Sequence, residues 1–453
     1  MSVVSMVSRS DAATPPLAAA LIAENFGERD GELTVGGISA TELAASFGSP
    51  LYVYDGDVIV QRYRALRSAV HGFADVYYSI KANPNPAVAR LLVDEGAGLE
   101  IASGAELLLA EAAGARAGDI LFAGPGKGER ELDLAIARGI GEIHLECFEE
   151  IEMVAALAAL AAAQGRVANI AIRINPSAAA QGGAMRMGGK PAAFGFDEEI
   201  IDDVLAAIAA KPSLHLSGVH LFAGTQILDA DVLLSQWAHG LRLAADVGRR
   251  TGTPVARIDL GGGLGIPYHD GDKTLDLNAV AAGAQLLDQE RRADPWLRSA
   301  QILIEPGRYL TGPAGVYLSR VRAVKTSRGH RFVIGDGGMH HHLAASGNLG
   351  QVIKRDYPIV AASRLSDRDL APATVVGPLC TPLDTLGRQA RLPDVAAGDL
   401  VAILQSGAYG LSASPVGFLS HPMPAEVVVR GGHAELVRRC GDFEAPMVNP
   451  HGS

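Results

Sequence analysis

The sequence predicts an α/β protein that consists of a (β/α)8 TIM barrel and a β-rich second domain of the β-sandwich or barrel-like kind. Eight short apolar runs recur between residues 76 and 310, and helical stretches rich in Ala, Leu and Glu separate most of them. Eight alternating βα units predict a parallel sheet that closes into a barrel. The flanking residues carry β-type runs punctuated by Gly and Pro, and 453 residues exceed one ordinary domain. We therefore expect a barrel over 55–310 and a β-rich domain over 1–54 and 311–453.

Each predicted barrel strand is a short apolar run that stops at a polar, Gly or Pro residue or at a helical stretch. In chain order these strands are 76–80, 99–102, 120–122, 142–145, 169–174, 216–221, 257–260 and 302–305. Apolar residues at helical spacing predict helices between them, for example over 105–113 and 148–163. In the β-rich domain, strands are predicted over 315–325, 331–335, 374–376, 400–404 and 426–430. Residues 1 to about 30 are expected to be weakly ordered.

Composition disfavours several classes of protein. A net charge of −11 argues against a nucleic-acid partner. The three cysteines are widely spaced and form neither a disulfide framework nor a zinc pattern, so no metal site is predicted. The sequence has no signal-peptide pattern and no apolar stretch long enough to cross a bilayer. We expect a cytoplasmic protein without membrane association.

Lys81 is the first candidate catalytic residue. It follows the predicted strand 76–80 and begins the segment Lys81-Ala82-Asn83-Pro84-Asn85. We expect apolar surroundings at this strand end, which would weaken the charged form of the amine and favour a neutral nucleophile. Such an amine forms a Schiff base with a carbonyl, most notably that of pyridoxal phosphate. A solvated structural lysine is the commoner outcome for an isolated strand end, but the motifs elsewhere in the chain favour catalysis.

Two motifs after the late barrel strands support this interpretation. Gly261-Gly262-Gly263-Leu264-Gly265 follows the seventh strand, where backbone N–H groups can bind a phosphate, although a tight turn also explains a glycine run. Glu305-Pro306-Gly307-Arg308 ends the eighth strand. A carboxylate such as Glu305 keeps a pyridine nitrogen protonated, and the ring then accepts electrons as decarboxylation requires. A structural ion pair between Glu305 and Arg308 is the alternative.

Three further motifs lie in the β-rich domain. Cys380, within Gly377–Asp384, offers a thiol as proton donor, although most cysteines are simply small buried residues. Tyr409 offers a phenol to a phosphate or a substrate. The histidines 340–342 follow Asp336-Gly337-Gly338-Met339, and in an extended chain only the first and third share a face. No other ligand lies at metal spacing, so a role beside the substrate or at an interface is favoured.

Together the motifs resemble those of the fold-type III pyridoxal-phosphate decarboxylases, the group of the diaminopimelate, ornithine and arginine decarboxylases. The resemblance covers the chain from Pro50 to about Phe418, and the motifs occur in the family's order. It implies pyridoxal 5'-phosphate as the cofactor. It also implies a head-to-tail homodimer in which each active site lies at the subunit interface.

The resemblance further implies roles for individual residues. Lys81 would carry the Schiff base, Glu305 would pair with the pyridine nitrogen, and Cys380 of the neighbouring subunit would reprotonate the carbon that loses CO2. The expected cofactor-binding residues are Lys81, Phe222, Thr225, Gly261, Gly262, Gly263, Glu305, Gly307, Arg308 and Tyr409. The expected substrate-binding residues are Arg308, His340, His342, Thr381 and Asp384.

Three departures from the family pattern bear on the substrate. Phe222 stands where the family usually has a histidine that stacks on the cofactor ring, so a stacking contact is kept and a titratable one is lost. Thr381 replaces the glutamate that follows the catalytic cysteine in diaminopimelate decarboxylases. The arginine and tyrosine that hold the distal end of diaminopimelate are also missing, because three histidines and Leu343-Ala344-Ala345 follow Met339. Free diaminopimelate is therefore not the expected substrate.

Several segments look closer to a subgroup that includes the carrier-protein-tethered glutamyl decarboxylase of butirosin biosynthesis and the exosortase-associated decarboxylases. These segments are 185–189, 194–195, 224–226, the three histidines and 380–382. We expect decarboxylation of an L-amino acid or of an aminoacyl group tethered to a carrier protein. Diaminopimelate decarboxylation, amino-acid racemisation and a catalytically inactive regulatory role are the alternatives. Glu305 argues against a racemase, and the joint presence of Lys81, Glu305 and Cys380 argues against an inactive homologue.

Overall fold

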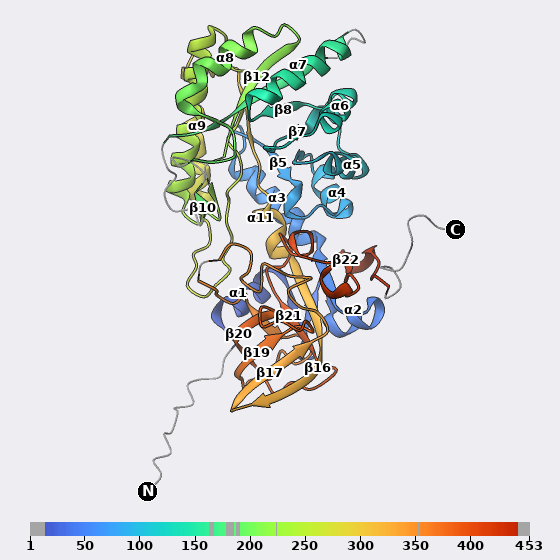
Figure 1. The fold of residues 1–453 in the computed structure, drawn as a ribbon. Helices are drawn as coiled ribbons and strands as arrows, with labels where there is room; N and C mark the ends of the chain where they lie inside the picture. The colour runs from blue at the N-terminus through green and yellow to red at the C-terminus, as the bar shows by residue number, and fades with distance from the viewer. Residues whose placement is uncertain are drawn as a thin grey trace, which may run out of the picture. The chain divides into compact units, whose positions relative to one another are not determined.

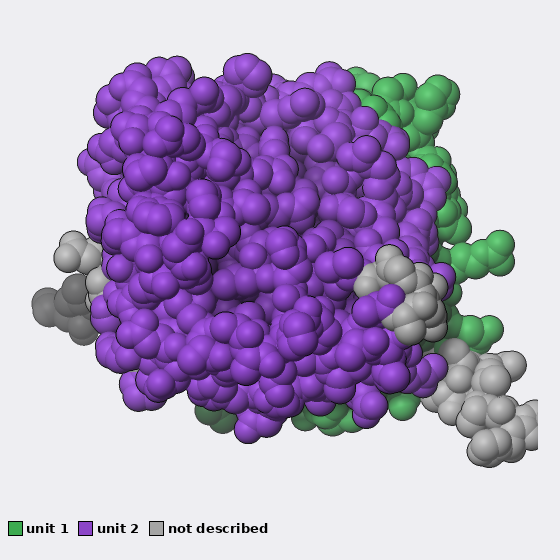
Figure 2. Space-filling view, turned by 90° about the horizontal axis from the view of Figure 1, so that it is seen from above, with its two compact units in different colours: residues 1–58, 268–272, 313–453 green, residues 59–267, 273–312 purple. Residues whose placement is uncertain are grey.

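The structure is a computed structural model that describes residues 14–162, 167–177, 185–186 (backbone only), 191–222, 224–351 and 353–442. The chain divides into two compact units, which Figure 2 shows in different colours. The barrel unit comprises residues 59–267 and 273–312. The β-rich unit comprises residues 1–58, 268–272 and 313–453.

The barrel unit contains a closed barrel of eight parallel strands (Figure 1). In chain order the strands are β5 (Asp75–Ser79), β6 (Gly98–Ile101), β7 (Ile120–Phe122), β8 (Glu142–Leu145), β9 (Ala168–Asn175), β12 (Leu214–Leu221), β14 (Arg257–Asp259) and β15 (Gln301–Ile304). Each strand pairs with the next one in the chain, and β15 pairs with β5 to close the ring. The predicted strands agree with these to within two residues at each end, and the predicted fold class is confirmed.

In the part of the barrel unit that the structure describes, seven helices alternate with the barrel strands. They are α4 (Pro86–Asp94), α5 (Gly104–Ala112), α6 (Glu129–Arg138), α7 (Phe148–Ala162), α8 (Ile201–Ala209), α9 (Ala230–Thr251) and α10 (Leu277–Ala293). Local sequence sets where they begin. The side chains of Asn85, Ser103 and Asp229 accept backbone N–H groups at the starts of α4, α5 and α9, which satisfies donors that have no partner inside the helix. The eight strands run parallel, so their carboxyl ends lie on one face of the barrel.

The β-rich unit is built around a sheet in the order β20-β19-β17-β16-β4-β22-β23, with β21 pairing with both β16 and β18. Its strands are β4 (Leu51–Asp55), β16 (Gly315–Ser327), β17 (His330–Gly335), β18 (Ile359–Ala361), β19 (Ala371–Val376), β20 (Thr385–Leu392), β21 (Leu400–Ile403), β22 (Ala425–Arg430) and β23 (His433–Arg438). A small sheet of β1 (Gly27–Arg29), β2 (Glu32–Val35) and β3 (Ile38–Ser39) and the helices α1 (Pro16–Asn25) and α2 (Ala40–Phe47) complete it. Apolar residues of α1, α2, β2, β4, β16, β18, β21 and β22 share one core.

The N-terminal part of the chain differs from the prediction. Helix α1 and strand β1 occupy residues 16–29, where weak order was expected. The reason is packing, because Ala18 and Leu21 are buried in the core of the β-rich unit. Residues 1–13 lie outside the described residues. In the part of the chain that the structure describes, no helix has the length and apolar character needed to span a membrane.

Candidate active site

Lys81 lies in a short 3-10 turn, η1 (Ile80–Ala82), directly after β5. Its Nζ donates hydrogen bonds of 2.9 and 2.8 Å to the two carboxylate oxygens of Glu100, which is buried on β6. Ser79 Oγ donates to the same carboxylate at 2.5 Å. The Lys81 side chain is 45% exposed, so the predicted apolar surroundings are wrong. The neighbouring strand instead places a buried carboxylate against the amine.

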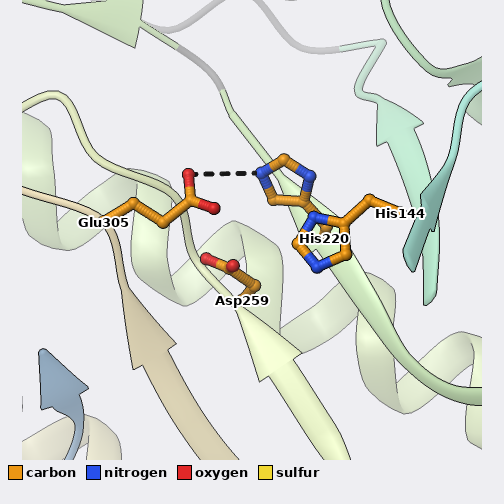
Figure 3. A group of neighbouring side chains, drawn as sticks. All are labelled: His144, His220, Asp259 and Glu305. Atoms are coloured by element: carbon orange, nitrogen blue, oxygen red, sulfur yellow. Dashed lines mark ion pairs between the residues drawn. The ribbon is translucent and has the colours of Figure 1, made fainter. Parts of the chain in front are cut away.

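Glu305, the first residue after β15, lies in a buried group with His144 of β8, His220 of β12 and Asp259 of β14 (Figure 3). Each of the four contributes a nitrogen or oxygen atom, and these atoms lie within 4.8 Å of one another. The His220 Nε2 atom is 3.6 Å from the Glu305 Oε2 atom, and the two imidazole ring centroids are 4.3 Å apart. Closure of the barrel brings these four strands together, so a titratable cluster forms where barrel interiors usually hold branched aliphatic residues.

Burial and mutual charge set the protonation of this cluster. Burial lowers the pKa of His220 to about 4, so its imidazole is neutral near pH 7. Burial raises the pKa of Asp259 well above its usual range, and the negative charge of Glu305 raises it further. Burial also opposes ionisation of Glu305, but His220, Lys81 and a hydrogen bond with Asp259 together hold its pKa below its usual range. Glu305 is therefore the ionised carboxylate of the cluster.

The glycine run forms a tight loop because neighbouring backbone leaves no room for side chains. A Cβ atom at Gly261, whose φ is 69°, would lie 2.4 Å from the Leu221 carbonyl oxygen, and one at Gly262 would lie 2.4 Å from the Glu305 carbonyl oxygen. Among the described residues, no acceptor takes the N–H groups of Gly262 and Gly263. Two backbone donors at the carboxyl end of a barrel fit an anionic group such as a phosphate.

The segment Glu305–Arg308 lies directly against the turn that holds Lys81. The Ser79 N–H donates to the Pro306 carbonyl oxygen at 3.4 Å, and a Cβ atom at Gly307 would lie 2.9 Å from the Ala82 Cβ. Arg308 begins the short helix α11 (Arg308–Thr311). The structure thus brings Lys81, Glu305 and Arg308 to the same end of the barrel.

Phe222 and Thr225 follow β12 at this same end. A Cβ atom at Gly261 would lie 3.2 Å from the Phe222 ring, so the ring lies against the glycine loop. Thr225 belongs to β13 (Gly224–Thr225), which pairs with β10 (Met185–Arg186). Residues 187–189 of the subgroup motif lie outside the described residues. The predicted cofactor contacts of Phe222 and Thr225 stay predictions.

The three consecutive histidines of the β-rich unit lie in a buried turn. The N–H groups of His341 and His342 both donate to the Gly338 carbonyl oxygen, at 2.9 and 3.1 Å, and all three side chains are buried. The prediction of an extended segment with two histidines on one face is therefore wrong. His342 Nε2 bonds to Ser406 Oγ at 2.9 Å, whereas His340 has no hydrogen-bond partner among the described residues. Their predicted contact with substrate stays a prediction.

Cys380 is an exposed free thiol in the loop between β19 and β20. Asp384 holds this loop in place through hydrogen bonds. Its Oδ1 accepts the Met339 N–H at 2.6 Å, its Oδ2 accepts the Leu379 N–H at 2.8 Å, and its own N–H donates to the Thr381 carbonyl oxygen at 3.2 Å. Asp384 is therefore the residue that holds the cysteine loop to the Asp-Gly-Gly-Met loop. The predicted contacts of Thr381 and Asp384 with substrate stay predictions.

Tyr409 lies in a second tight loop of the β-rich unit. Its φ of 53° is in the left-handed region, which strains a tyrosine. The flanking glycines pack closely, since a Cβ at Gly315 would lie 2.1 Å from the Gly407 nitrogen and one at Gly410 would lie 2.8 Å from the Tyr52 hydroxyl. The predicted contact of the phenol with a phosphate or a substrate stays a prediction.

Sequence reasoning assigned no role to Glu100, His144 or Asp259, which the structure places beside the predicted residues. Each is a titratable residue next to apolar residues within a short, buried barrel strand. Such a residue is buried in a barrel interior only at a cost in free energy unless it has partners. The signal in the sequence was therefore a titratable residue among apolar neighbours in a predicted strand. The sequence does not show which side chains that residue meets in the folded barrel.

Comparison with known proteins agrees with this geometry. The family model of the pyridoxal-dependent decarboxylases, pyridoxal binding domain, matches residues 57–312. The L-glutamyl-[BtrI acyl-carrier protein] decarboxylase of Niallia circulans is 41% identical over 404 residues, which cover 88% of this chain and 93% of that protein. The diaminopimelate decarboxylase of Aquifex aeolicus is 32% identical over 419 residues, which cover 92% and 95%. The crystal structure of diaminopimelate decarboxylase from M. jannaschii with L-lysine matches with a TM-score of 0.85 at 26% identity, covering 94% of this chain and 98% of that one.

The chain belongs to the pyridoxal-dependent decarboxylases. The predicted family, enzyme class and cofactor are confirmed by these matches. Family membership also favours decarboxylation over the racemase and inactive alternatives.

Proposed function

We propose that this decarboxylase acts on an aminoacyl group tethered to a carrier protein, or on an amino acid whose distal end carries no free charge. The proposal is supported by the residues that follow Met339. Three buried histidines and then Ala344 and Ala345, both buried and apolar, stand where a diaminopimelate decarboxylase has its distal clamp. A pocket without a cationic clamp lacks the bidentate ion pair that would select a free distal carboxylate.

The relatives support the same choice. The similar protein from Niallia circulans is named for a glutamyl group on an acyl-carrier protein, and it shares 41% of residues with this chain. The diaminopimelate decarboxylase of Aquifex aeolicus shares 32% over a similar length. Diaminopimelate decarboxylation is the second candidate, supported by the number of relatives of that name.

The barrel unit fits pyridoxal phosphate. The N–H groups of Gly262 and Gly263, which have no acceptor among the described residues, suit its phosphate, and the buried ionised carboxylate of Glu305 suits its ring nitrogen. Lys81, 2.8 Å from Glu100, offers an amine for its aldehyde. Phe222 offers a ring face for stacking, and Arg308 a cation for the phosphate or the substrate carboxylate.

When bound, pyridoxal phosphate supplies an aldehyde that bonds to amines and a ring that withdraws electrons from the carbon that bears the leaving carboxylate. Glu100 accepts hydrogen bonds from Lys81 Nζ, so it can take the proton that the ammonium must lose to become a nucleophile. Glu305 keeps a negative charge in the buried cluster, where it stabilises a proton on a ring nitrogen. Cys380, an exposed thiol on a loop fixed by Asp384, donates a proton to the carbon that has lost CO2.

We infer from the resemblance that the enzyme is a homodimer in which Cys380 acts at the site that contains Lys81 of the other subunit. The exposure of Cys380 supports this role, because a thiol must be accessible in its own subunit to act in the neighbouring one.

The test of substrate is a product analysis by mass spectrometry with free meso-diaminopimelate, free L-glutamate, amidated amino acids and an aminoacyl carrier protein. We expect kcat/KM for the tethered or amidated substrate to exceed that for diaminopimelate by about tenfold to a hundredfold, the worth of one charge-assisted pair. Restoring a cation by Ala344→Arg should raise turnover of diaminopimelate, and Ala344→Gln is the matched neutral control. Saturable turnover of free diaminopimelate with no gain from tethering would contradict the proposal.

A further inference from the structure

Asp259 is a buried acid to which the proposed mechanism gives no task. It ends β14 and lies in the cluster of Figure 3 with Glu305, His220 and His144. Its Oδ1 atom accepts the Gly261 N–H at 2.8 Å. Its Oδ2 atom has no hydrogen-bond donor among the described residues when both acids are ionised, and the Oε1 atom of Glu305 has none either. Two carboxyl groups therefore face each other with unsatisfied oxygens.

Two carboxylates this close in a buried cluster do not readily both ionise, because their like charges repel each other where little water screens them. The surrounding charges indicate which one keeps its proton. Lys81 of η1 stabilises the charge of Glu305, whereas the charges of Glu305 and of Glu100 on β6 both oppose ionisation of Asp259. His220 of β12 is neutral near pH 7, since burial lowers its pKa to about 4.

Two other groups on neighbouring strands act on His220 of this cluster. His144 of β8 lies against the His220 ring, and Arg173 of β9 acts on His220 as a positive charge that opposes its protonation. Neither supplies a hydrogen bond to Asp259 in the described part of the chain. The proton on Asp259 Oδ2 is therefore the donor that satisfies both acids at once.

We propose that Asp259 keeps its proton and donates it in a hydrogen bond to Glu305, and so acts as a positioning residue for that carboxylate. The inference rests on the proposed function to the extent that Glu305 serves the cofactor ring. One oxygen of Asp259 is held by the glycine loop and the other by Glu305, so Asp259 links the phosphate loop to the ring carboxylate. The pair carries one negative charge, which matches the single positive charge of a protonated pyridine ring.

Infrared spectroscopy of the full-length holoenzyme tests where the proton lies. A protonated buried carboxyl group has a C=O stretching band that is separate from the bands of carboxylates. We expect this band at neutral pH, a shift of it on 13C-labelling of aspartate but not of glutamate, and its loss in Asp259→Asn. A purely structural acid in its ionised form would give no such band.

Rebinding of pyridoxal phosphate to the cofactor-depleted full chain tests the positioning role. Asparagine offers an oxygen to the Gly261 N–H and an N–H to Glu305, so Asp259→Asn should keep most of the wild-type affinity. Asp259→Leu, which has a similar volume and neither group, should lose about tenfold to a hundredfold, as expected for one hydrogen bond to a charged acceptor. If the leucine variant does not fold, the asparagine variant and the infrared band still test the proposal.

Four outcomes would overturn it: absence of the protonated-carboxyl band, a band that shifts with labelled glutamate, equal losses in the asparagine and leucine variants, or a stoichiometric transition metal in the purified enzyme. Failure of the proposed function looks different. In that case wild-type protein would not rebind pyridoxal phosphate, or Glu305→Gln would bind it as well as wild type, while the aspartate band would be unaffected.

Discussion

Single residues in this chain acquire their chemistry from one or two partners. Lys81 shows this most directly, because its amine is partly exposed yet bonded to a buried carboxylate. An exposed lysine without that partner is a solvated cation, whereas Glu100 both orients the amine and offers a place for its proton.

Covalent attachment of the cofactor is the prediction that tests Lys81. Reduction of the purified holoenzyme with borohydride, followed by peptide mapping, should place the pyridoxyl group on Lys81, because the turn that holds this amine lies against the Glu305–Arg308 segment. Lys81→Ala should carry no label. Label on another lysine, such as Lys127, whose amine is buried against Glu150, would contradict the assignment.

The buried histidines predict a pH dependence of stability. Burial lowers the pKa of His342 to about 3, whereas an unfolded histidine titrates near pH 6.5. The unfolded state thus binds more protons below about pH 6.5, so stability falls as pH drops from there towards 3, by up to about 1.4 kcal/mol per pH unit.

Hydrogen exchange of the β16 amides, corrected for the intrinsic effect of pH, measures this loss. We expect protection in the wild type to fall with pH more steeply than in His342→Gln, by roughly tenfold per pH unit. His433→Gln removes an exposed histidine of the same unit and is the matched control. Equal slopes in the wild type and His342→Gln would mean that His342 is not held neutral.

At the scale of elements, contacts between neighbouring strand ends of the barrel set the distance between the glycine loop and Glu305. The glycine loop after β14 is pressed against the ends of β12 and β15, because Cβ atoms at Gly261 and Gly262 would lie within 2.4 Å of carbonyl oxygens there. This contact ties the backbone donors of the loop to the position of Glu305.

The variant Gly262→Ala tests whether this close contact fixes the position of the glycine loop relative to Glu305. The added methyl group would force the backbone at Glu305 to move, and overpacking of this kind costs about 1–3 kcal/mol. We expect the affinity for pyridoxal phosphate to fall by about fivefold to a hundredfold, measured by absorbance titration of cofactor-depleted protein. Gly118→Ala is the control, since its Cβ would meet no atom within 4 Å. Unchanged affinity in Gly262→Ala would show that the close contact does not shape the site.

At the scale of the whole molecule, the prediction concerns sharing of the site between subunits. Lys81 lies in the barrel unit and Cys380 in the β-rich unit. Homodimers of Lys81→Ala and of Cys380→Ala should both be impaired, whereas mixed dimers should regain one intact site. After subunit exchange we expect about a quarter of the wild-type activity, because half of the dimers are mixed and each holds one intact site.

The control for this experiment is each variant mixed with itself under the same conditions. Exchange is verified by mass spectrometry of the intact dimers. Verified exchange without any gain in activity would indicate that Lys81 and Cys380 of the same chain work together.

Local sequence patterns were sufficient for the barrel, for the order of its strands and for Lys81, the glycine loop and Glu305 as candidates. Strand and helix periodicity are properties of neighbouring residues, and the carboxyl ends of parallel strands share one face whatever the rest of the fold does. The pattern of apolar runs therefore carries this information in a single chain.

The partners of those residues depend on contacts between distant segments. Glu100 reaches Lys81 because β6 pairs with β5, and His144, His220, Asp259 and Glu305 meet only because the barrel closes. The three histidines turn inward because Gly338 and Ser406 lie where they can bond to them. Protonation depends on burial and on the charges nearby, so the state of Asp259 and Glu305 follows from three-dimensional packing and has no signature in local sequence.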